Sequence, residues 1–573
     1  MPRSQTGLRL SLVLAVCVVM PSTLTAQTWV PTATQAVVLS NATDLGPLPA
    51  VTPLHITVAL QLPNADAVKQ FVKSQNTPGD PLYGTELSPD QFVASYGPTA
   101  GQVQAVSSYL ASLGFTNIAV EPNNLLITAD GTTAAVDAAF NTQIDQFNLN
   151  GKEIYGNVRA AQVPSTLGGT VLAVLGLNTA YQMSLPSSSP SNPSGIKICG
   201  PIGSVVCPIS FYTPKDFQKA YDVGATSTGQ KTTIAIFAFG SVAGVVNDLR
   251  VAEQQNGLPQ VSVVVKQVGI PNSTDFGGGE WQLDTQMSTG MAQTVKTLFI
   301  YTVTNPFDSD TTLLFNRFVT DKLARAGSAS FGLCEEFAFA DGSMLVNDQI
   351  FLQGAAQGQT VFASTGDQGS ACPVSGATNG VPLSGVPGAV LYPASSPYVV
   401  AVGGTQLFTD SSGNYVAENG WEAGGGGISA VENCTHWQIA ATVPSCAASG
   451  NRGVPDVAMD AALETGGLVY IGCPPKDPNP NNDCLFITGG TSMSSPLALG
   501  VWARVQSTSN NKLGYASPQL YGRYQFGPPP SDPGFHDIVT GSNGAYTALP
   551  GWDFVTGLGS FDVARFCALN CHF

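Results

Sequence analysis

The feature that most limits the fold is a regular alternation of short apolar segments with longer helical segments after Phe211. Seven apolar segments are expected to be strands, at residues 233–239, 262–268, 297–303, 328–333, 361–364, 398–402 and 485–488. Helices are expected between many of them, at residues 245–254, 280–293, 313–324 and 343–353. Apolar strands separated by helices are typical of a sheet buried on both faces. The sequence therefore predicts a large α/β domain with a buried, mostly parallel sheet.

A second, smaller unit is expected before this domain, because 573 residues exceed the usual size of a single hydrophobic core. Between Leu54 and Asn178, short strands and short amphipathic helices alternate, which predicts an α+β fold. Residues 184–195 are rich in Pro, Ser and Gly, the composition of an exposed linker that proteases cut readily. We therefore expect four segments: 1–26, 27–183, a linker at 184–210, and the large domain at 211–573.

The first 26 residues have the pattern of an export signal. Arg3 and Arg9 give a positive start, residues 10–20 form an apolar run, and Pro21 precedes a polar stretch that ends at Ala26. The run is shorter than the roughly 20 residues that a membrane span needs. We therefore expect cleavage after Ala26, secretion, and no membrane anchor.

The charge balance excludes one broad class of partner. Only 10% of the residues are charged, the net charge is −16 and the pI is about 4.5. Nucleic-acid binding requires a basic surface, which this composition does not supply. Few ionisable pairs also leave less stability to lose when carboxylates take up protons in acid. We expect an acidic, monomeric extracellular protein that binds no nucleic acid.

Cysteine usage indicates disulfides. Removing residues 1–26 takes Cys17 from the total of 11 and leaves ten, although a lipoprotein signal at Cys17 is an alternative. An even number in an exported protein favours disulfides. Pairs close in sequence are the candidates, namely Cys199–Cys207, Cys434–Cys446, Cys473–Cys484 and Cys567–Cys571, which leaves Cys334 and Cys372. The connectivity stays open, and a zinc site is the weaker rival because there is no Cys-x-x-Cys pair and only four His.

The strongest local motif is Gly-Gly-Thr-Ser-Met-Ser-Ser-Pro at residues 489–496, between an apolar strand and a helical run. A Ser at such a turn presents its hydroxyl at the helix N-terminus, where the helix dipole favours developing negative charge. Pro496 is expected early in the helix, where its missing N–H costs little. The alternative is a simple helix cap of hydroxyl residues. The full motif resembles the nucleophile motif of subtilisin-like serine peptidases, with Ser492 as the nucleophile.

A serine nucleophile needs a base, which is usually a histidine. The four histidines are His55, His436, His536 and His572. None of them is followed by Gly-Thr, as the base of a subtilisin would be. Only His536 remains a candidate, so another base is expected.

Glu280 and Asp284 supply that base. They lie four residues apart and share one face of the expected helix, which Met287 and Met291 continue as a buried stripe. An acidic pair at this spacing can also be a solvated helix edge. Two carboxyls in a confined site, however, share a proton, and the pKa of one of them rises. Such a pair can act as a general base in acid, where His would be protonated.

Residues 364–369, Ser-Thr-Gly-Asp-Gln-Gly, follow the end of an expected strand. The segment can be read as a plain Gly/Asp turn. Its functional interpretation is that Asp367 stays protonated, so that its O–H donates a hydrogen bond to an oxyanion.

The order Glu-x-x-x-Asp, Gly-Asp, Gly-Thr-Ser-x-x-x-Pro resembles the sedolisin family of serine-carboxyl peptidases, which includes the kumamolisins. Further similar segments lie at residues 211–221, 392–405, 424–430 and 452–458, and the resemblance covers nearly all of residues 53–573. Residues 53–178 resemble the activation prodomain of the family. The resemblance implies a subtilisin-like catalytic domain preceded by a small ferredoxin-like prodomain.

The resemblance also implies roles for the site residues. Ser492 would be the nucleophile, Glu280 the base, Asp284 its partner, and Asp367 the oxyanion donor. The expected protein is a secreted, acid-active endopeptidase of proteins or peptides, made as a self-processing zymogen with its prodomain as intramolecular inhibitor; tripeptidyl-peptidase action stays open. The alternatives are a subtilisin-type peptidase with His536 as base, and a catalytically idle binding protein with the same fold.

A calcium site is implied near the C-terminus. Asp537 and Asp553 would provide carboxylates, and Ile538, Leu549 and Gly551 would provide backbone carbonyls. Leu549 stands where many relatives have Gly, which matters little for a ligand that acts through its carbonyl.

Two positions depart from the family pattern. Some relatives extend the carboxyl network with a Glu and a Trp, where this chain has Ala238 and Phe331. The resemblance therefore implies the core site without this extension, and a shifted acid optimum.

Overall fold

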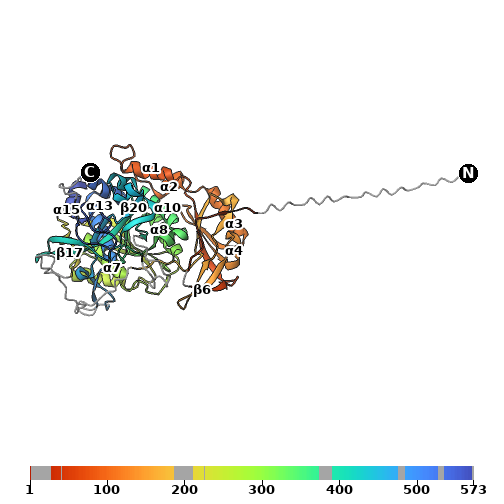
Figure 1. Cartoon of the computed structure of the whole chain (residues 1–573), viewed down its shortest axis with the longest axis horizontal. Helices are drawn as coiled ribbons and strands as arrows, with labels where there is room; N and C mark the ends of the chain where they lie inside the picture. The colour runs from red at the N-terminus through yellow and green to blue at the C-terminus, as the bar shows by residue number, and fades with distance from the viewer. Residues whose placement is uncertain are drawn as a thin grey trace.

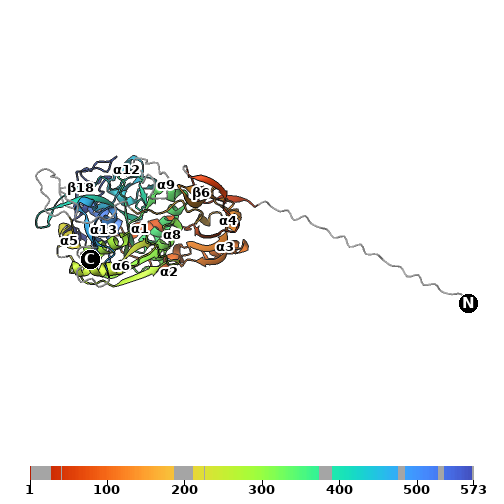
Figure 2. The same ribbon diagram turned by 90° about the horizontal axis from the view of Figure 1, so that it is seen from below.

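The computed structural model describes Met1 and residues 27–39, 42–185, 211–224, 226–372, 390–474, 484–526 and 534–570. The expected signal apart from Met1, and the linker apart from its first two residues, lie outside these ranges. So do four cysteines of the sequence analysis, Cys17, Cys199, Cys207 and Cys571. The described chain forms a smaller N-terminal part and a larger second part, which lie side by side in two perpendicular views (Figures 1 and 2).

The N-terminal part is built on a four-stranded antiparallel sheet with the strand order β4-β5-β3-β9. Its elements are β3 (Pro53–Leu60), α3 (Ala100–Ser112), β4 (Thr116–Val120), β5 (Leu126–Thr132), α4 (Thr133–Phe140) and β9 (Val171–Leu175). A strand-helix-strand-strand-helix-strand chain with this order is ferredoxin-like, which confirms the expected fold. Thr132 caps α4 by accepting a hydrogen bond from the Ala135 N–H.

Additional elements extend this unit. β2 (Thr43–Pro47), β6 (Ile144–Leu149) and β7 (Lys152–Asn157) form a second antiparallel sheet, and β1 (Trp29–Pro31) pairs with β8 (Gln162–Pro164). Two helices, α1 (Ala65–Gln75) and α2 (Pro89–Tyr96), leave the sheet and reach over the second part of the molecule (Figure 1). The N-terminal part therefore contacts the second part through a projecting arm, residues 65–96, as well as through its sheet.

The second part contains the buried sheet that the sequence predicts. The strand order is β11-β12-β10-β13-β15-β17-β18, with β21 also paired to β17. The strands are β10 (Gly229–Phe239), β11 (Val263–Gln267), β12 (Val295–Val303), β13 (Ala326–Ala329), β15 (Thr360–Ser364), β17 (Val399–Thr409), β18 (Tyr415–Gly420) and β21 (Val457–Asp460). All pairings are parallel except β17 with β18, so the expected mostly parallel α/β sheet is confirmed.

Two strand predictions need correction. Residues 485–488 do form a strand, β23 (Leu485–Thr488), but it pairs with β22 (Gly467–Tyr470) outside the main sheet. The expected strand at 328–333 is divided, because β13 ends at Ala329 and β14 (Leu333–Cys334) pairs with β16 (Leu391–Tyr392). A short apolar run predicts extended backbone but does not specify which sheet it joins.

Helices α7 (Glu280–Ala292), α8 (Asp308–Asp321), α10 (Ser343–Ala356), α13 (Thr491–Thr508) and α14 (Ala516–Phe526) pack on this sheet. Helix α6 (Val245–Gln255) packs on α7, and α9 (Glu335–Ala340) packs on α10. Helix α8 begins five residues earlier than the sequence predicted. Phe315 and Phe318 of α8 make edge-on contacts with Phe237 of β10.

Helix α13 is the central helix of the domain. Residues 491–507 are all buried, and the helix lies against β10, β13, β15 and β17. Its neighbour is α7, and Gly500 is needed for their close approach because an added Cβ would lie 2.6 Å from the Ser288 carbonyl oxygen. Pro496 is the sixth residue of α13, deeper in the helix than the sequence analysis expected.

Disulfides follow the local pairing. Cys434–Cys446 and Cys473–Cys484 are formed as the spacing suggested, and Cys334 pairs with Cys372. Cys567 is also disulfide-bonded, while its expected partner Cys571 lies outside the described residues. Within the described ranges, no helix is long and apolar enough to cross a membrane.

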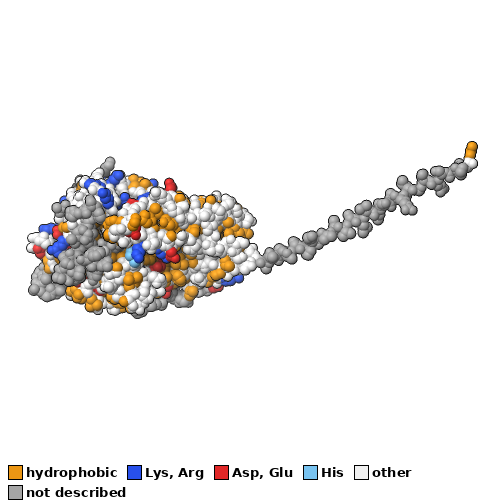
Figure 3. Space-filling model, turned by 90° about the horizontal axis from the view of Figure 1, so that it is seen from above, with side chains coloured by type: hydrophobic (Ala, Val, Ile, Leu, Met, Phe, Trp, Pro, Cys, Tyr) orange, Lys and Arg blue, Asp and Glu red, His pale blue; other side chains and the backbone are white. Residues whose placement is uncertain are grey.

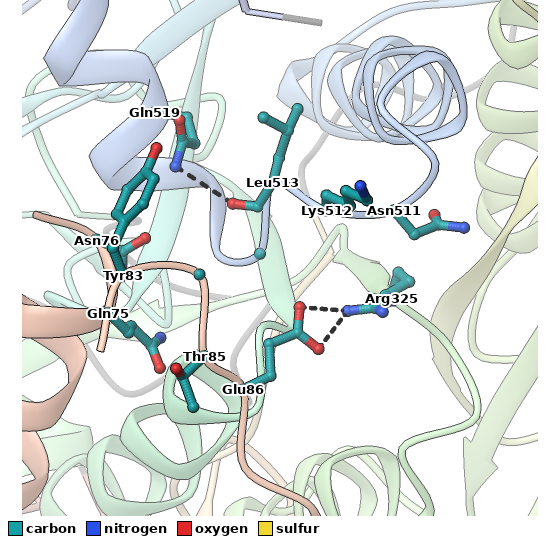
Figure 4. Close-up of a pocket in the computed structure, with 12 residues that line it drawn as sticks. Gln75, Asn76, Tyr83, Thr85, Glu86, Arg325, Asn511, Lys512, Leu513 and Gln519 are labelled. Atoms are coloured by element: carbon teal, nitrogen blue, oxygen red, sulfur yellow. Dashed lines mark hydrogen bonds and ion pairs between the residues drawn. The ribbon is translucent and has the colours of Figure 1, made fainter. Parts of the chain in front are cut away.

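The N-terminal part contacts the helices of the second part through polar groups. Gln349 of α10 accepts a hydrogen bond from the Leu62 N–H, and Asn123 donates to Asn316 of α8. Where the arm meets the catalytic domain, Arg325 binds Glu86 beside a cavity of about 480 Å³ (Figure 4). Charged groups are otherwise sparse on the face seen in Figure 3, in keeping with the composition.

Candidate active site

Ser492 lies in the first turn of α13, where the sequence analysis expected the nucleophile. Gly490 precedes the helix with φ +91°, a conformation that favours glycine. The Ser492 side chain is fully buried in the full-length chain. Its hydroxyl therefore lies at the positive end of a buried helix, where negative charge is stabilised.

Glu280 and Asp284 lie on the first turns of α7, on the face predicted to be buried. Gly279 precedes the helix with φ +109°, and Met287 and Met291 continue the same buried face. Asp284 is fully buried. The acidic pair is therefore no solvated helix edge.

Burial raises the pKa of both carboxyl groups. For Asp284 the proximity of Glu280 raises the pKa further, while a hydrogen bond from Ser330 lowers it. For Glu280 the Ser492 hydroxyl lowers the pKa, and the charge of Asp367 raises it. The Ser492 hydroxyl is thus near this carboxyl, but neither its Oγ nor Glu280 Oε1 meets the geometry of a regular hydrogen bond with any described residue. Such contacts commonly tighten only when substrate is bound.

Asp367 follows the end of β15 and is held by the residue before the nucleophile. The backbone N–H and the hydroxyl of Thr491 both donate to Asp367 Oδ1, over 2.8 and 2.9 Å. The Thr491 hydroxyl in turn accepts a hydrogen bond from the Gly366 N–H. The predicted oxyanion donor and the predicted nucleophile are thus joined through one threonine.

Two residues of this site were missed by the sequence analysis. Thr491 was part of the nucleophile motif but was given no role. Ser330 donates to Asp284 Oδ1 over 2.6 Å, and its Oγ lies 3.3 Å from the Ser492 carbonyl oxygen. No local pattern marks Ser330, because its partners lie 46 and 162 residues away.

The two departures from the family pattern place apolar side chains where those relatives have a Glu and a Trp. Ala238 and Phe331 are both fully buried. The Phe331 ring packs against Phe239, which also contacts Trp281 beside Glu280. Because neither side chain can be ionised, neither position extends the carboxyl network beyond Glu280 and Asp284.

The structure places His536 away from these groups. Its ring stacks on Tyr415 of β18, with 3.7 Å between ring centroids. Burial lowers the pKa of His536 to about 4. His55 hydrogen-bonds Asp130 in the prodomain, and His436 packs on Trp437. Among the described residues, the charged groups that raise the pKa values of Glu280 and Asp284 are carboxyl groups.

The predicted calcium loop brings its two carboxyl groups onto one short segment. The Gly551 N–H donates to both oxygens of Asp537, and the Leu549 N–H donates to Asp553. Gly551 has φ +83°, Ile538 is buried, and the Leu549 side chain is exposed. The two carboxylates are oxygen ligands of the kind that calcium prefers. No group of three or more His, Cys, Asp or Glu side chains suited to a metal occurs in the described ranges.

The fold and these residues define a subtilase-type peptidase with its own activation domain. The family "Pro-kumamolisin, activation domain" matches residues 40–180, and the "Subtilase family" matches residues 275–520. The chain is 37% identical to sedolisin from Pseudomonas sp. (strain 101) over 571 residues, covering 94% of this chain and 92% of that protein. It is 30% identical to kumamolisin from Bacillus sp. (strain MN-32), covering 91% and 92%.

A solved structure agrees with these sequences. Pseudomonas sedolisin, a serine-carboxyl proteinase complexed with two molecules of pseudo-iodotyrostatin, matches with a TM-score of 0.56 and 36% identity. The match covers 63% of this chain and 98% of that one. The chain belongs to the sedolisin family of serine-carboxyl peptidases. It is a peptidase that carries its prodomain in the same polypeptide.

Proposed function

We propose that the chain is the zymogen of a secreted, acid-active endopeptidase in which Ser492 is the nucleophile and Glu280 the general base. The observation that carries the proposal is the position of a buried carboxyl pair beside a serine at a helix N-terminus. Isolated carboxyls are costly to bury, and a pair with raised pKa values is a common property of acid–base sites.

In the proposed reaction, the Ser492 Oγ attacks the carbonyl carbon of the substrate while its proton passes to Glu280. The tetrahedral oxyanion is stabilised by Asp367 in its protonated form and by the N-terminal end of α13. The proton then passes from Glu280 to the leaving amine, and the C–N bond breaks. Water hydrolyses the acyl-enzyme by the same proton transfers in reverse order.

The carboxyl pair accounts for work in acid. When Glu280 and Asp284 share one proton, one of them is ionised while the other stays neutral. An ionised carboxylate can accept the serine proton at a pH where an imidazole would already be protonated. In this scheme the proton is shared by the pair, which titrates as a unit, and Asp284 makes no contact with the substrate.

Self-processing is supported by the position of the first linker residue. Ser184 and Gly332 exchange two backbone hydrogen bonds, 2.9 and 3.0 Å long, as an antiparallel pair. Gly332 lies two residues after Ser330, which contacts Asp284. The chain therefore enters the linker beside the candidate site, in the extended form that a peptide substrate takes. We propose that the chain cuts itself between residues 184 and 210.

We further propose that the loop of Asp537, Ile538, Leu549, Gly551 and Asp553 binds one structural calcium ion. Burial raises the pKa of both Asp537 and Asp553. Asp553 is buried, whereas Asp537 is exposed. A bound cation would offset the cost of burying the Asp553 carboxylate, and would close the loop without taking part in catalysis.

The test uses the purified full-length chain, moved from neutral pH to about pH 3–5, where carboxyls titrate. We expect self-cleavage and casein hydrolysis in acid, with a new N-terminus within residues 184–211. Glu280→Gln should lower kcat/KM by about 10²–10⁴-fold, the range for loss of a general base. Ser492→Ala should abolish both activities. Glu336→Gln, which changes an exposed carboxyl on α9, is the matched control and should behave as wild type.

Substantial activity in Glu280→Gln with a maximum near neutral pH would contradict the carboxyl mechanism and return the search to His536. No hydrolysis of any peptide by the wild type would favour an idle binding protein. Secretion is tested separately, since export to the medium with removal of residues 1–26 is expected in a suitable host.

A further inference from the structure

Ser330 has a position that neither the sequence pattern nor the proposed roles explain. It follows β13, is fully buried, and lies between α7 and α13. Its hydroxyl oxygen is 2.6 Å from Asp284 Oδ1 and 3.3 Å from the carbonyl oxygen of Ser492. A single hydroxyl thus contacts both the helix of the carboxyl pair and the backbone of the nucleophile.

The Ser492 carbonyl is open to this contact because of Pro496. In an α-helix the carbonyl of one residue accepts from the N–H four residues later. Pro496 is four residues after Ser492 and has no N–H. The Ser492 carbonyl therefore lacks its usual donor four residues later, and Ser330 is placed to donate to it.

We propose that Ser330 is a positioning residue, whose hydroxyl holds Asp284 against the backbone of Ser492 in either protonation state of Asp284. The inference rests on the proposed function, because it concerns the same carboxyl pair. When Asp284 is ionised, the Ser330 O–H donates to Oδ1. When Oδ1 carries a proton, the Asp284 O–H donates to the Ser330 Oγ, and the Ser330 O–H turns toward the Ser492 carbonyl.

This rotation keeps Asp284 and Ser330 hydrogen-bonded to each other before and after a proton moves. A hydrogen bond to an ionised group is stronger than one between neutral groups. Ser330 therefore favours the ionised form of Asp284, and burial alone would otherwise hold the proton more tightly. The buried side chains of Phe331 and Ala238 have no hydrogen-bonding group that could replace this hydroxyl.

Other charged groups near α7 do not take over this role. The charge of Asp367 raises the pKa of Glu280, and Glu280 raises the pKa of Asp284. The other charged groups on the neighbouring elements bind partners other than Glu280 and Asp284. On α6, Asp248 accepts from the Gly472 and Cys473 N–H groups, and Arg250 binds Glu253. On the other elements, Arg504 donates to the Met291 carbonyl, Asp216 accepts from Thr213, Lys219 donates to the Ser412 carbonyl, and Lys231 donates to Asn510. Lys215 and Lys296 lie on α5 (Pro214–Ala220) and β12, and Lys296 is exposed.

A matched control lies two residues earlier in the sequence, within β13. Ser328 is also fully buried, and its Oγ lies 2.7 Å from the Ser495 Oγ of α13. Ser328→Ala therefore removes the same atom and one hydrogen bond to the same helix, but touches neither carboxyl group. A structural effect alone would appear in both variants.

The experiment measures kcat/KM of the processed enzyme against pH, for wild type, Ser330→Ala and Ser328→Ala. The pair should bind its protons more tightly without the Ser330 hydroxyl. We expect the acidic limb of the Ser330→Ala profile to move to higher pH by about one unit, as for the loss of a hydrogen bond to a charged group. At a pH below the limb this is about a tenfold loss of rate, whereas the limb of Ser328→Ala should stay in place.

An unchanged acidic limb in Ser330→Ala, or an equal shift in Ser328→Ala, would overturn the inference. If Ser330→Ala does not fold, Ser330→Cys replaces it, because a thiol keeps the volume and is a weaker donor; the limb should move in the same direction. Failure of the proposed function itself is recognised separately, since Glu280→Gln would then keep its activity.

Discussion

Arg325 of the catalytic domain donates two hydrogen bonds, 2.6 and 2.7 Å long, to the carboxylate of Glu86 in the prodomain (Figure 4). Lys322 lies 3.7 Å from the same carboxylate. Gly358 has φ +75°, and a Cβ at this position would lie 2.4 Å from Glu86 Oε1. The catalytic domain is therefore shaped to receive this one side chain.

Arg325→Ala should weaken the attachment of the prodomain arm. The change removes a half-buried ion pair in which Arg325 Nη1 contacts both carboxylate oxygens of Glu86, and we expect a loss of about 1–3 kcal/mol in arm docking. Limited proteolysis of the arm in a Ser492→Ala background, which prevents self-cleavage, measures the effect. Arg317→Ala on the exposed face of α8 is the control. Equal protection of the arm in both variants would contradict this role of Arg325.

The pH dependence of stability should have a clear contribution from Glu418. Burial raises the pKa of Glu418 from 4.5 to about 7, although hydroxyl groups of Ser560, Thr405 and Tyr221 favour its ionised form. Between these two pH values the folded chain binds more protons than the unfolded chain, so stability falls as pH rises. The fall amounts to about 3 kcal/mol at this site.

Glu418→Gln should flatten this dependence. The amide stays neutral at all pH values, its oxygen can accept from Tyr221, and its NH2 can donate to Ser560. Thermal denaturation of the variant should show a smaller decrease in Tm between pH 4.5 and 7 than wild type shows. Glu336→Gln serves again as the exposed control. A steeper decrease in Glu418→Gln would show that the carboxylate is stabilising at neutral pH.

Gly500→Ala should separate the two helices of the site. The added Cβ would lie 2.6 Å from the Ser288 carbonyl oxygen and 2.7 Å from the Met291 Cβ. Overpacking of this kind costs about 1–3 kcal/mol, and it moves α7 relative to α13. We expect a lower Tm and a lower kcat. Gly522→Ala on α14 meets no atom within 4 Å and should be neutral or slightly stabilising. Wild-type values for both would contradict the packing argument.

Removal of calcium should lower the Tm. A ligand that binds only the folded chain stabilises it by mass action, so a chelator should destabilise the wild type and added calcium should restore it. Asp553→Asn should lower the Tm in calcium and abolish the response to the chelator. Glu464→Gln, at an exposed position, should keep the full response. An identical wild-type Tm with and without chelator would exclude a stabilising ion.

The sequence predicted those parts of the site that depend on local spacing. Glu280 and Asp284 share a helix face because they are four residues apart, and Ser492 lies in the first turn of a helix because its motif joins a strand to a helical run. Ser330 could not be found in this way, because its partners come from two other elements. The effect of Pro496 was misjudged for a related reason, since the position of a proline within a helix depends on where the helix begins.

The fold was predictable to a similar depth. Apolar runs identified the strands of the parallel sheet and the strand pattern of the prodomain. They did not show that β23 leaves the main sheet, nor that the strand after Ala326 ends at Ala329 and resumes at Leu333. The attachment of Glu86 to Arg325 was also invisible, because it joins residues 239 positions apart.

The pairing of Ser184 with Gly332 is intramolecular, so its stability does not depend on the protein concentration. Both backbone polar groups of Gly332 are bonded to Ser184, and the Ser184 hydroxyl also donates to the Gly332 carbonyl. No external extended peptide can form the same two bonds while this segment is in place. Dilution cannot break this pairing, since both residues belong to one molecule. If the linker is cut as proposed, each copy of the chain would lose its own Ser184 segment in a step that needs no second molecule.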